Sequence, residues 1–156
     1  MLKIIGIGEY CVSYDLDTII KTFALGSCVA LTAYCREKKV LGMAHIALPS
    51  SNIRKGKTEF PNAYFADLAV PLVINEICIK CGIACRKLEI KLFGGASFGK
   101  GNDYFNIGKN NIIAVTNMLN AYGYSYDLSN TGRSVSRTVE VDVMSGNYKL
   151  TEYALT

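Results

Sequence analysis

The sequence predicts a single α/β domain in which mixed or antiparallel β-sheets are layered with two main helices. Short β-branched and apolar runs, bounded by turn residues, alternate with two longer segments of helical character. A Ser145-Gly146-Asn147 turn joins the last two runs as a hairpin, which argues against a wholly parallel sheet. The chain has 156 residues, half of them apolar, so we expect residues 1–156 to form one domain around one core.

The expected strands are short runs rich in β-branched and apolar residues. The first segment, 2–14, is expected to form one or two strands broken near Gly6 and Gly8, because glycine interrupts a strand. The segment 28–34 is too short for periodicity to separate a strand from a short helix. The remaining strands are expected at 18–23, 40–48, 88–93, 124–128, 137–143 and 147–153.

The two helices are expected on either side of the 88–93 strand. Asn62 is a candidate cap for a helix that runs to Cys81, where Gly82 stops it, and Pro71 within it predicts a kink or a late start. A second helix is expected over 108–122. The predicted core faces consist of Phe65, Leu68, Leu72 and Val73 in the first helix, and of Ile112, Val115, Leu119 and Tyr122 in the second. The polar stretch 50–60 is the longest expected loop.

Composition and charge exclude several classes of protein. The net charge is +4 and the lysines and arginines are scattered, whereas a nucleic-acid-binding protein would cluster them in a stripe. Gly6, Gly8 and Glu9 interrupt the apolar start of the chain too early for a signal peptide. No apolar run is expected to be long enough to span a bilayer. We therefore expect a cytoplasmic protein with no nucleic-acid partner and no direct insertion into the membrane.

Six cysteines require an interpretation, and three of them lie close together in the sequence, at Cys78, Cys81 and Cys85. Their spacing is compatible with a thiol redox protein or a metal site. The residues around them look helical and apolar, however, and cysteine commonly behaves as a small buried hydrophobe. A zinc site also needs a fourth ligand. We expect no metal and no cofactor, and the redox or metal hypothesis is kept as an alternative.

Cys28 has the surroundings of a nucleophile. It follows Gly26-Ser27, a tight turn that presents a side chain at the end of a strand and leaves backbone N–H groups near it for a developing oxyanion. A thiol needs a base to become an effective nucleophile. His45 is the sole histidine of the chain, and Thr22 is the candidate for the third group that holds it, through its hydroxyl or its carbonyl.

The motifs, taken in order, resemble the chemoreceptor glutamine deamidase family, CheD, over essentially the whole chain. The ordered set is more specific than any one of its members. The motifs that carry the resemblance are Ile5-Gly6-Ile7-Gly8-Glu9-Tyr10, Leu25-Gly26-Ser27-Cys28-Val29-Ala30, Gly42-Met43-Ala44-His45-Ile46-Ala47-Leu48-Pro49, Phe65-Ala66-Asp67 with Ala69, Lys91-Leu92-Phe93-Gly94-Gly95-Ala96-Ser97, and Asn106-Ile107-Gly108 with Asn110.

The resemblance implies a cysteine hydrolase whose fold is similar to the catalytic domain of cytotoxic necrotizing factor, a bacterial toxin that deamidates host GTPases. It implies Cys28 as nucleophile, His45 as base and Thr22 as third member. Its implied substrates are glutamines of chemotaxis receptors, which become glutamates, and its implied partner is the CheC phosphatase. The glycine-rich turn 94–97 lacks the lysine of a phosphate-binding loop, so we interpret it as a lining of the site in which Ser97 contacts substrate.

Two points stay open at the level of sequence. The segment 127–137 departs from the family pattern, because it lacks a double glycine, and this affects any partner contact made there. The alternative function is a catalytically weak binding module that acts through CheC. The intact set of Cys28, His45 and Thr22 argues for the enzyme.

Overall fold

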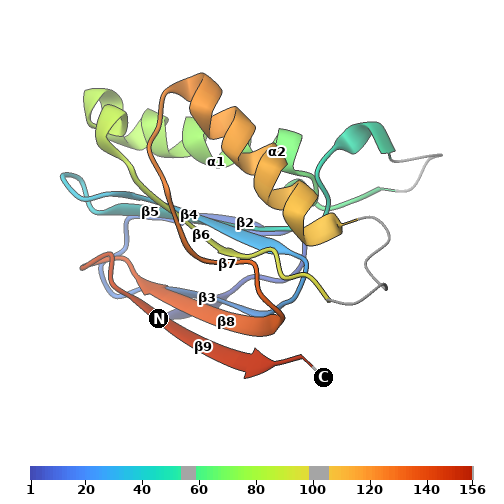
Figure 1. Ribbon diagram of the computed structural model, residues 1–156. Coiled ribbons are helices and arrows are strands. Elements are labelled where there is room, and N and C mark those ends of the chain that lie inside the picture. The colour runs from blue at the N-terminus through green and yellow to red at the C-terminus, as the bar shows by residue number, and fades with distance from the viewer. Residues whose placement is uncertain (54–58, 99–105, 156) are drawn as a thin grey trace.

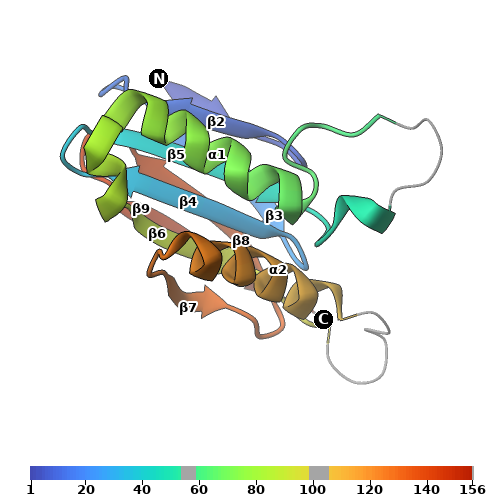
Figure 2. The same cartoon turned by 90° about the horizontal axis from the view of Figure 1, so that it is seen from above.

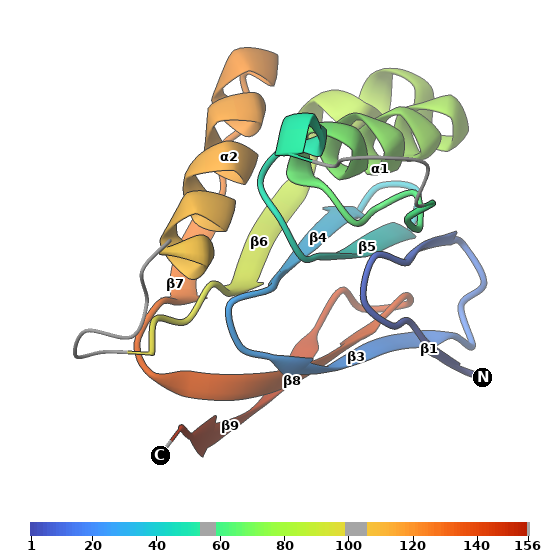
Figure 3. The same cartoon turned by 90° about the vertical axis from the view of Figure 1, so that its right-hand side faces the viewer.

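Three layers make up the structure, a computed structural model that describes residues 1–53, 59–98 and 106–155 (Figure 1). Two helices lie over a five-stranded sheet, and a four-stranded sheet lies against the opposite face of that sheet (Figure 3). Both sheets contain parallel and antiparallel pairs. The predicted fold class, a single α/β domain with mixed sheets and two main helices, is confirmed.

The five-stranded sheet is the middle layer. Its strands, in spatial order, are β2 (Tyr10–Ser13), β5 (Val40–Ile46), β4 (Val29–Cys35), β6 (Glu89–Gly94) and β7 (Asp127–Thr131). Every residue of β4 and β5 is buried, because helices cover one face of this sheet and the second sheet covers the other (Figure 2). This double burial explains why 28–34 shows no alternation in the sequence. In the structure, this segment forms the strand β4.

The four-stranded sheet has one covered face. Its strands, in spatial order, are β1 (Leu2–Ile4), β3 (Ile19–Leu25), β8 (Val135–Asp142) and β9 (Tyr148–Ala154). In β8 the buried residues Arg137, Val139 and Val141 alternate with half-buried ones, as expected when a single face meets the core. The break predicted near Gly6 and Gly8 separates β1 from β2.

The first helix, α1 (Ala66–Cys81), begins later than Asn62, so the predicted cap is wrong. The reason is tertiary: the carbonyl of Tyr64 accepts hydrogen bonds from Ala47 and Leu48, and Phe65 pairs with Leu48 in extended conformation. The predicted core face is also partly wrong, because Leu68 is 41% exposed. The helix ends at Gly82, with φ of 56°, as predicted.

The segment Ala66–Lys87, which combines α1 with the 3₁₀ helix η2 (Gly82–Lys87), is long and apolar enough to cross a membrane by length and composition. The expectation that no apolar run reaches that length is therefore wrong. In the structure the buried residues of α1 pack on β4 and β5, in the core between the helices and the five-stranded sheet (Figure 2). Burial inside the domain accounts for part of the apolar composition of this segment, whereas Ile79 and Ile83 are 82% and 76% exposed.

The second helix, α2 (Ile107–Tyr122), agrees with the prediction, although Tyr122 is 46% exposed and does not belong to its core face. The strand predicted at 124–128 lies three residues later, as β7, because Tyr124 and Tyr126 instead pack against the core of the helix layer. Part of the predicted loop 50–60 forms a 3₁₀ turn, η1 (Ser51–Ile53), and residues 54–58 lie outside the described residues.

Candidate active site

The chain crosses from one sheet to the other at the Gly26-Ser27-Cys28 corner. β3 ends at Leu25 in the four-stranded sheet, and β4 begins at Val29 in the five-stranded sheet. The pairing of β3 with β8 shifts register between Thr22 and Leu25, where Ala24 has a φ of 56°. A bulge of this kind bends a strand and turns it away from its partner. The corner therefore places Cys28, half-buried, at one end of the layer between the sheets.

The register of β4 against β5 brings His45 close to Cys28. Ala30 pairs with His45, and Cys28 lies two residues before Ala30. Side chains two residues apart on a strand point to the same face, so Cys28 and His45 are diagonal neighbours on one face, with Cα atoms roughly 7–8 Å apart in such a pair. That face borders the core between the two sheets, against which Cys28 packs.

Thr22 holds the imidazole of His45 from the other sheet. The Thr22 Oγ1 atom lies 2.7 Å from Nδ1 of His45 and also donates a hydrogen bond of 2.8 Å to the carbonyl of Ile5. A hydroxyl has one proton, and here that proton goes to Ile5. Nδ1 must therefore carry its own proton and donate it to Thr22. This assigns the neutral His45 to the Nδ1–H tautomer, with an unprotonated Nε2.

The Nε2 atom of His45 is free to accept a proton. It is buried and has no hydrogen-bond partner among the described residues, and His45 as a whole is 1% exposed. Burial lowers the pKa of His45 from 6.5 to about 4, although the nearby carboxylate of Glu9 acts in the opposite direction. Burial also raises the pKa of the Cys28 thiol. Both groups are therefore neutral at pH 7 in the free protein.

The backbone carbonyls of Gly26, Ser27 and Cys28 all accept hydrogen bonds. The carbonyls of three consecutive residues accept hydrogen bonds from the Gly94-Gly95-Ala96 turn and from α2. These bonds are Ala96 N–H to Gly26 at 2.8 Å, Asn111 Nδ2 to Ser27 at 2.9 Å and Gly95 N–H to Cys28 at 2.8 Å. The N–H groups of Ser27 and Cys28 have no acceptor in the described part of the chain. Two unpaired donors beside a thiol are the elements of an oxyanion hole.

Glycine is required where these segments approach one another. Gly94 has a φ of 101°, and a Cβ atom there would lie 2.2 Å from the Cys28 carbonyl oxygen. A Cβ on Gly108, in the first turn of α2, would lie 2.2 Å from the carbonyl oxygen of Ala96. The 94–97 turn is thus a close approach of the chain's own backbone segments beside Cys28, and its expected role in substrate contact stays a prediction.

Ser97 follows this turn directly and is half-buried. Its N–H donates to the Arg133 carbonyl at 3.0 Å, and its carbonyl accepts from the Ser134 hydroxyl at 2.7 Å. The divergent segment 127–137 therefore lies beside the site, where β7 crosses into β8. Phe98 is next to it, 52% exposed, with its ring 3.4 Å from the position of a Cβ on Gly26.

Sequence reasoning missed three contributors to this site. The Ile5 carbonyl fixes the Thr22 hydroxyl, Asn111 holds the Ser27 carbonyl, and Phe98 covers Gly26. Of these three residues, only Ile5 lies in one of the motifs that carry the family resemblance. Within the same motif, the Gly8 N–H donates to the His45 carbonyl at 2.8 Å, and the Glu9 carbonyl accepts from the His45 N–H at 3.0 Å.

The three cysteines that lie close together in the sequence are on the other side of the five-stranded sheet from Cys28. Cys78, Cys81 and Cys85 pack in the core beneath the helices. Burial is the main cause that raises the pKa of Cys78 to about 11 and that of Cys81 to about 12, which leaves both thiols protonated and weakly nucleophilic. Among the described residues, no group of three or more His, Cys, Asp or Glu side chains is arranged to hold a metal ion.

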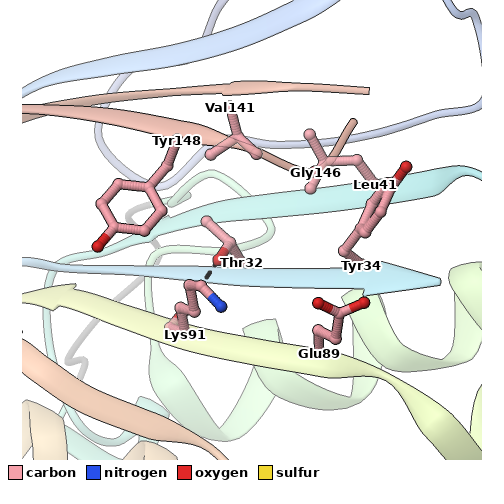
Figure 4. Close-up of a pocket in the computed structure, with 8 residues that line it drawn as sticks. All are labelled: Thr32, Tyr34, Leu41, Glu89, Lys91, Val141, Gly146 and Tyr148. Carbon is pink, nitrogen blue, oxygen red and sulfur yellow. Dashed lines mark hydrogen bonds between the residues drawn. The ribbon is translucent and has the colours of Figure 1, made fainter. Parts of the chain in front are cut away.

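A pocket between the sheets lies at the opposite end of β4 from Cys28 (Figure 4). Its lining includes Thr32, Tyr34, Lys91 and Tyr148, and its volume of about 10 Å³ accommodates at most one water molecule. The Thr32 hydroxyl donates to the Lys91 carbonyl at 3.2 Å across two adjacent strands. This pocket is too small for a glutamine side chain.

Comparison with known proteins decides the family. Residues 47–152 match the model of the family described as "CheD chemotactic sensory transduction". This chain belongs to the CheD family. A relative from Syntrophotalea carbinolica, named probable chemoreceptor glutamine deamidase CheD, is 46% identical over 144 residues, 92% of this chain and 89% of the relative. A chemoreceptor glutamine deamidase CheD from Thermotoga maritima is 40% identical over 146 residues, 94% of this chain and 88% of the relative.

The match to the CheD family model begins after both Cys28 and His45. The pairwise alignments reach further. An alignment of 144 residues leaves at most 12 residues of this chain outside it, so the Syntrophotalea alignment includes Thr22, Cys28 and His45. A Bacillus subtilis relative with the same deamidase name is 36% identical over 146 residues, 90% of this chain and 85% of the relative.

Proposed function

We propose that this CheD-family chain is a protein-glutamine deamidase, a glutaminase that hydrolyses the side-chain amides of glutamines on chemotaxis receptors to glutamates. Residues 1–156 act as a single deamidase domain, with Cys28 as nucleophile and His45 as proton-transfer partner. The observation that carries the proposal is the 2.7 Å contact between Thr22 and Nδ1 of His45, which leaves Nε2 unprotonated on the face shared with Cys28. The deamidase names of the relatives support the same reaction.

Acylation begins from a neutral pair, because burial disfavours both the thiolate of Cys28 and the imidazolium of His45. As Sγ attacks the glutamine carboxamide carbon, the thiol proton moves to Nε2 of His45, and the C=O electron pair moves onto oxygen. The N–H groups of Ser27 and Cys28, next to Gly26, donate to that oxyanion. Thr22 accepts from Nδ1 throughout, which stabilises the imidazolium.

Breakdown releases ammonia. Imidazolium His45 gives its Nε2 proton to the departing nitrogen while the C–N bond breaks, and a thioester on Cys28 remains. His45 then removes a proton from water as the water attacks the thioester carbon. The C–S bond breaks, Cys28 regains a proton, and glutamate leaves. The reaction needs neither metal nor organic cofactor, since each proton and electron pair is accounted for by these groups and water.

Substrate recognition is assigned to the surface around the 94–98 turn. Ser97 is the proposed polar contact to substrate, since its backbone is fixed at both ends and it follows the two donors Gly95 and Ala96. Phe98 offers an exposed aromatic ring beside Gly26 for the apolar side of a receptor helix.

The proposed location is the cytoplasm, where the modified part of a chemotaxis receptor lies, with no nucleic-acid partner and no direct insertion into the membrane. All six cysteines are free thiols, which agrees with a reducing compartment. The partnership with the CheC phosphatase stays a prediction from the family resemblance. Co-purification of this chain with CheC tests that prediction independently of the chemistry.

The decisive experiment compares wild-type protein with Cys28→Ala on a purified receptor cytoplasmic fragment. Mass spectrometry follows the conversion of glutamine to glutamate, and an ammonia assay follows release. Wild type is expected to deamidate, and Cys28→Ala is expected to lose all detectable turnover while keeping its fold. Cys35→Ala is the matched control, because Cys35 lies at the other end of β4.

Two results would contradict the proposal. Full activity in Cys28→Ala would remove the nucleophile. Receptor binding by the wild type without turnover would instead support the alternative of a catalytically weak binding module that acts through CheC. Alkylation of intact protein supplies a check on the thiol chemistry, because the proposal requires Cys28 to react faster than Cys78, Cys81 and Cys85.

A further inference from the structure

One side chain joins the two halves of the candidate active site. Asn111, in α2, is fully buried, and its Nδ2 atom donates to the Ser27 carbonyl at 2.9 Å and to the Ala47 carbonyl at 3.0 Å. Ser27 directly precedes the nucleophile, and Ala47 lies two residues after His45. A single amide group thus bridges the start of β4, next to Cys28, and the end of β5, next to His45.

The bond to Ser27 determines the direction of the Cys28 N–H. A trans peptide group is planar, and its C=O and N–H point in opposite directions. Holding the Ser27 oxygen therefore aims the Cys28 N–H away from Asn111. Because Gly95 holds the next carbonyl, that of Cys28, the peptide groups on both sides of the nucleophile are fixed.

The Asn111 amide leaves one buried atom unpaired while it donates two hydrogen bonds, which indicates that these two bonds have a role beyond packing. The Asn111 Oδ1 atom is buried and has no hydrogen-bond partner among the described residues. Unsatisfied buried acceptors are uncommon in folded proteins, and asparagine is a weak helix former. An apolar residue at this position would avoid both defects, but it would leave the Ser27 and Ala47 carbonyls without their shared donor.

We propose that Asn111 is a positioning residue of the deamidase, which aims the Cys28 N–H at the developing oxyanion by holding the Ser27 carbonyl. This inference rests on the proposed function. It concerns transition-state stabilisation and not the ionisation of the thiol. Asn111 touches neither substrate nor reacting atoms, so its effect passes through the Ser27–Cys28 peptide group.

The test separates oxyanion stabilisation from thiol reactivity. Asn111→Ala is expected to lower kcat for receptor deamidation about 100-fold, a loss typical of a misaligned oxyanion donor, with KM changed less than about threefold. Alkylation of Cys28 by iodoacetamide forms no oxyanion, so its rate is expected to stay within about twofold of wild type. Asn117→Ala, an exposed asparagine of the same helix, is the matched control and is expected to behave as wild type.

Two outcomes would overturn the inference. One is unchanged kcat in Asn111→Ala, and the other is a parallel fall in deamidation and in Cys28 alkylation, which would mean that Asn111 only maintains the local fold. If Asn111→Ala does not fold, by circular dichroism and thermal unfolding, Asn111→Ser retains a small donor and is judged by the same two rates. Absence of deamidation by the wild type would refute the proposed function itself, and the inference with it.

Discussion

The two ends of β4 differ in how completely their hydrogen bonds are made. At the end away from Cys28, the Tyr34 hydroxyl lies 2.8 Å from the Val143 carbonyl and 3.0 Å from the Met144 carbonyl. Beside it, Arg36 donates twice to the Glu89 carboxylate, at 2.7 and 2.9 Å. This end also holds the small pocket shown in Figure 4.

At the Cys28 end, buried polar groups are left without partners. Within the described residues these are Nε2 of His45, Oδ1 of Asn111 and Nη2 of Arg137, whereas the other end has one such side-chain atom, Oγ1 of Thr18 beside Val143. The N–H groups of Ser27 and Cys28 also lack acceptors among the described residues. An unmade buried hydrogen bond costs about 1–3 kcal/mol, so this end is expected to reduce stability while it retains bonding capacity for a ligand. The same strand thus contributes stability at one end and, in the proposed function, the nucleophile at the other.

The largest expected effect is on kcat, and it tests the role of the Cys28 end of β4. His45→Gln removes the proton acceptor at Nε2, and general acid–base groups contribute about 10²–10⁴-fold to rate, so we expect kcat to fall about 10³-fold. Receptor affinity is expected to be unchanged, because His45 is buried. Stopped ammonia assays and a receptor-binding titration measure the two quantities. A variant that keeps more than a tenth of wild-type kcat would contradict the role of His45.

The second effect is on stability and follows from the low pKa of His45. The folded value is about 4 and the ordinary value is 6.5, so between these pH values the unfolded chain binds the proton more readily. The free energy of unfolding is therefore expected to be highest above pH 6.5 and to lose about 3 kcal/mol as the pH falls through about 4. Urea titrations at several pH values measure it.

His45→Gln is the control for the pH effect, since it removes the titrating group and is expected to flatten this part of the pH dependence. The carboxyl groups of the chain contribute equally to wild type and to His45→Gln. The difference between the two curves therefore isolates the contribution of His45. Identical curves for wild type and variant would show that burial does not lower the pKa of His45.

A smaller loss of rate is expected from Thr22→Val, which preserves shape but removes the acceptor for Nδ1–H. The imidazole then loses its fixed tautomer and orientation, and kcat is expected to fall about 10–30-fold. Thr22→Ser keeps the hydroxyl and is expected to stay within about threefold of wild type. Equal kcat values for the Val and Ser variants would exclude the hydroxyl as the group that orients His45.

The smallest effect belongs to the other end of β4. Tyr34→Phe removes the hydroxyl that donates to the 143–144 turn and leaves the Val143 carbonyl unpaired, at a cost of about 1–2 kcal/mol in the free energy of unfolding, while the Met144 carbonyl keeps its hydrogen bond from Lys39. Deamidation by folded protein is expected to be unchanged. Chemical unfolding and the ammonia assay give both values. A rate loss as large as that of Thr22→Val would mean that the two ends are coupled.

Local patterns predicted most elements, and they failed where tertiary contacts compete with local preference. Asn62 is a favourable cap by residue type, yet α1 starts at Ala66, because Tyr64 and Phe65 pair with the end of β5. Tyr124 and Tyr126 have strand character, yet they pack against the helix-layer core before β7 begins.

The sequence by itself determined the α/β class, the order of strands and helices, and the candidates Cys28, His45 and Thr22, because composition, turn residues and motif order are local properties. Only the tertiary structure decided the tautomer of His45, the unpaired donors at Ser27 and Cys28, and the bridge made by Asn111. The contacts behind these findings join Thr22 to Ile5, Thr22 to His45 and Asn111 to Ser27, across 17, 23 and 84 residues of chain. Such contacts depend on sheet register and on the crossing between the sheets, which no local pattern specifies.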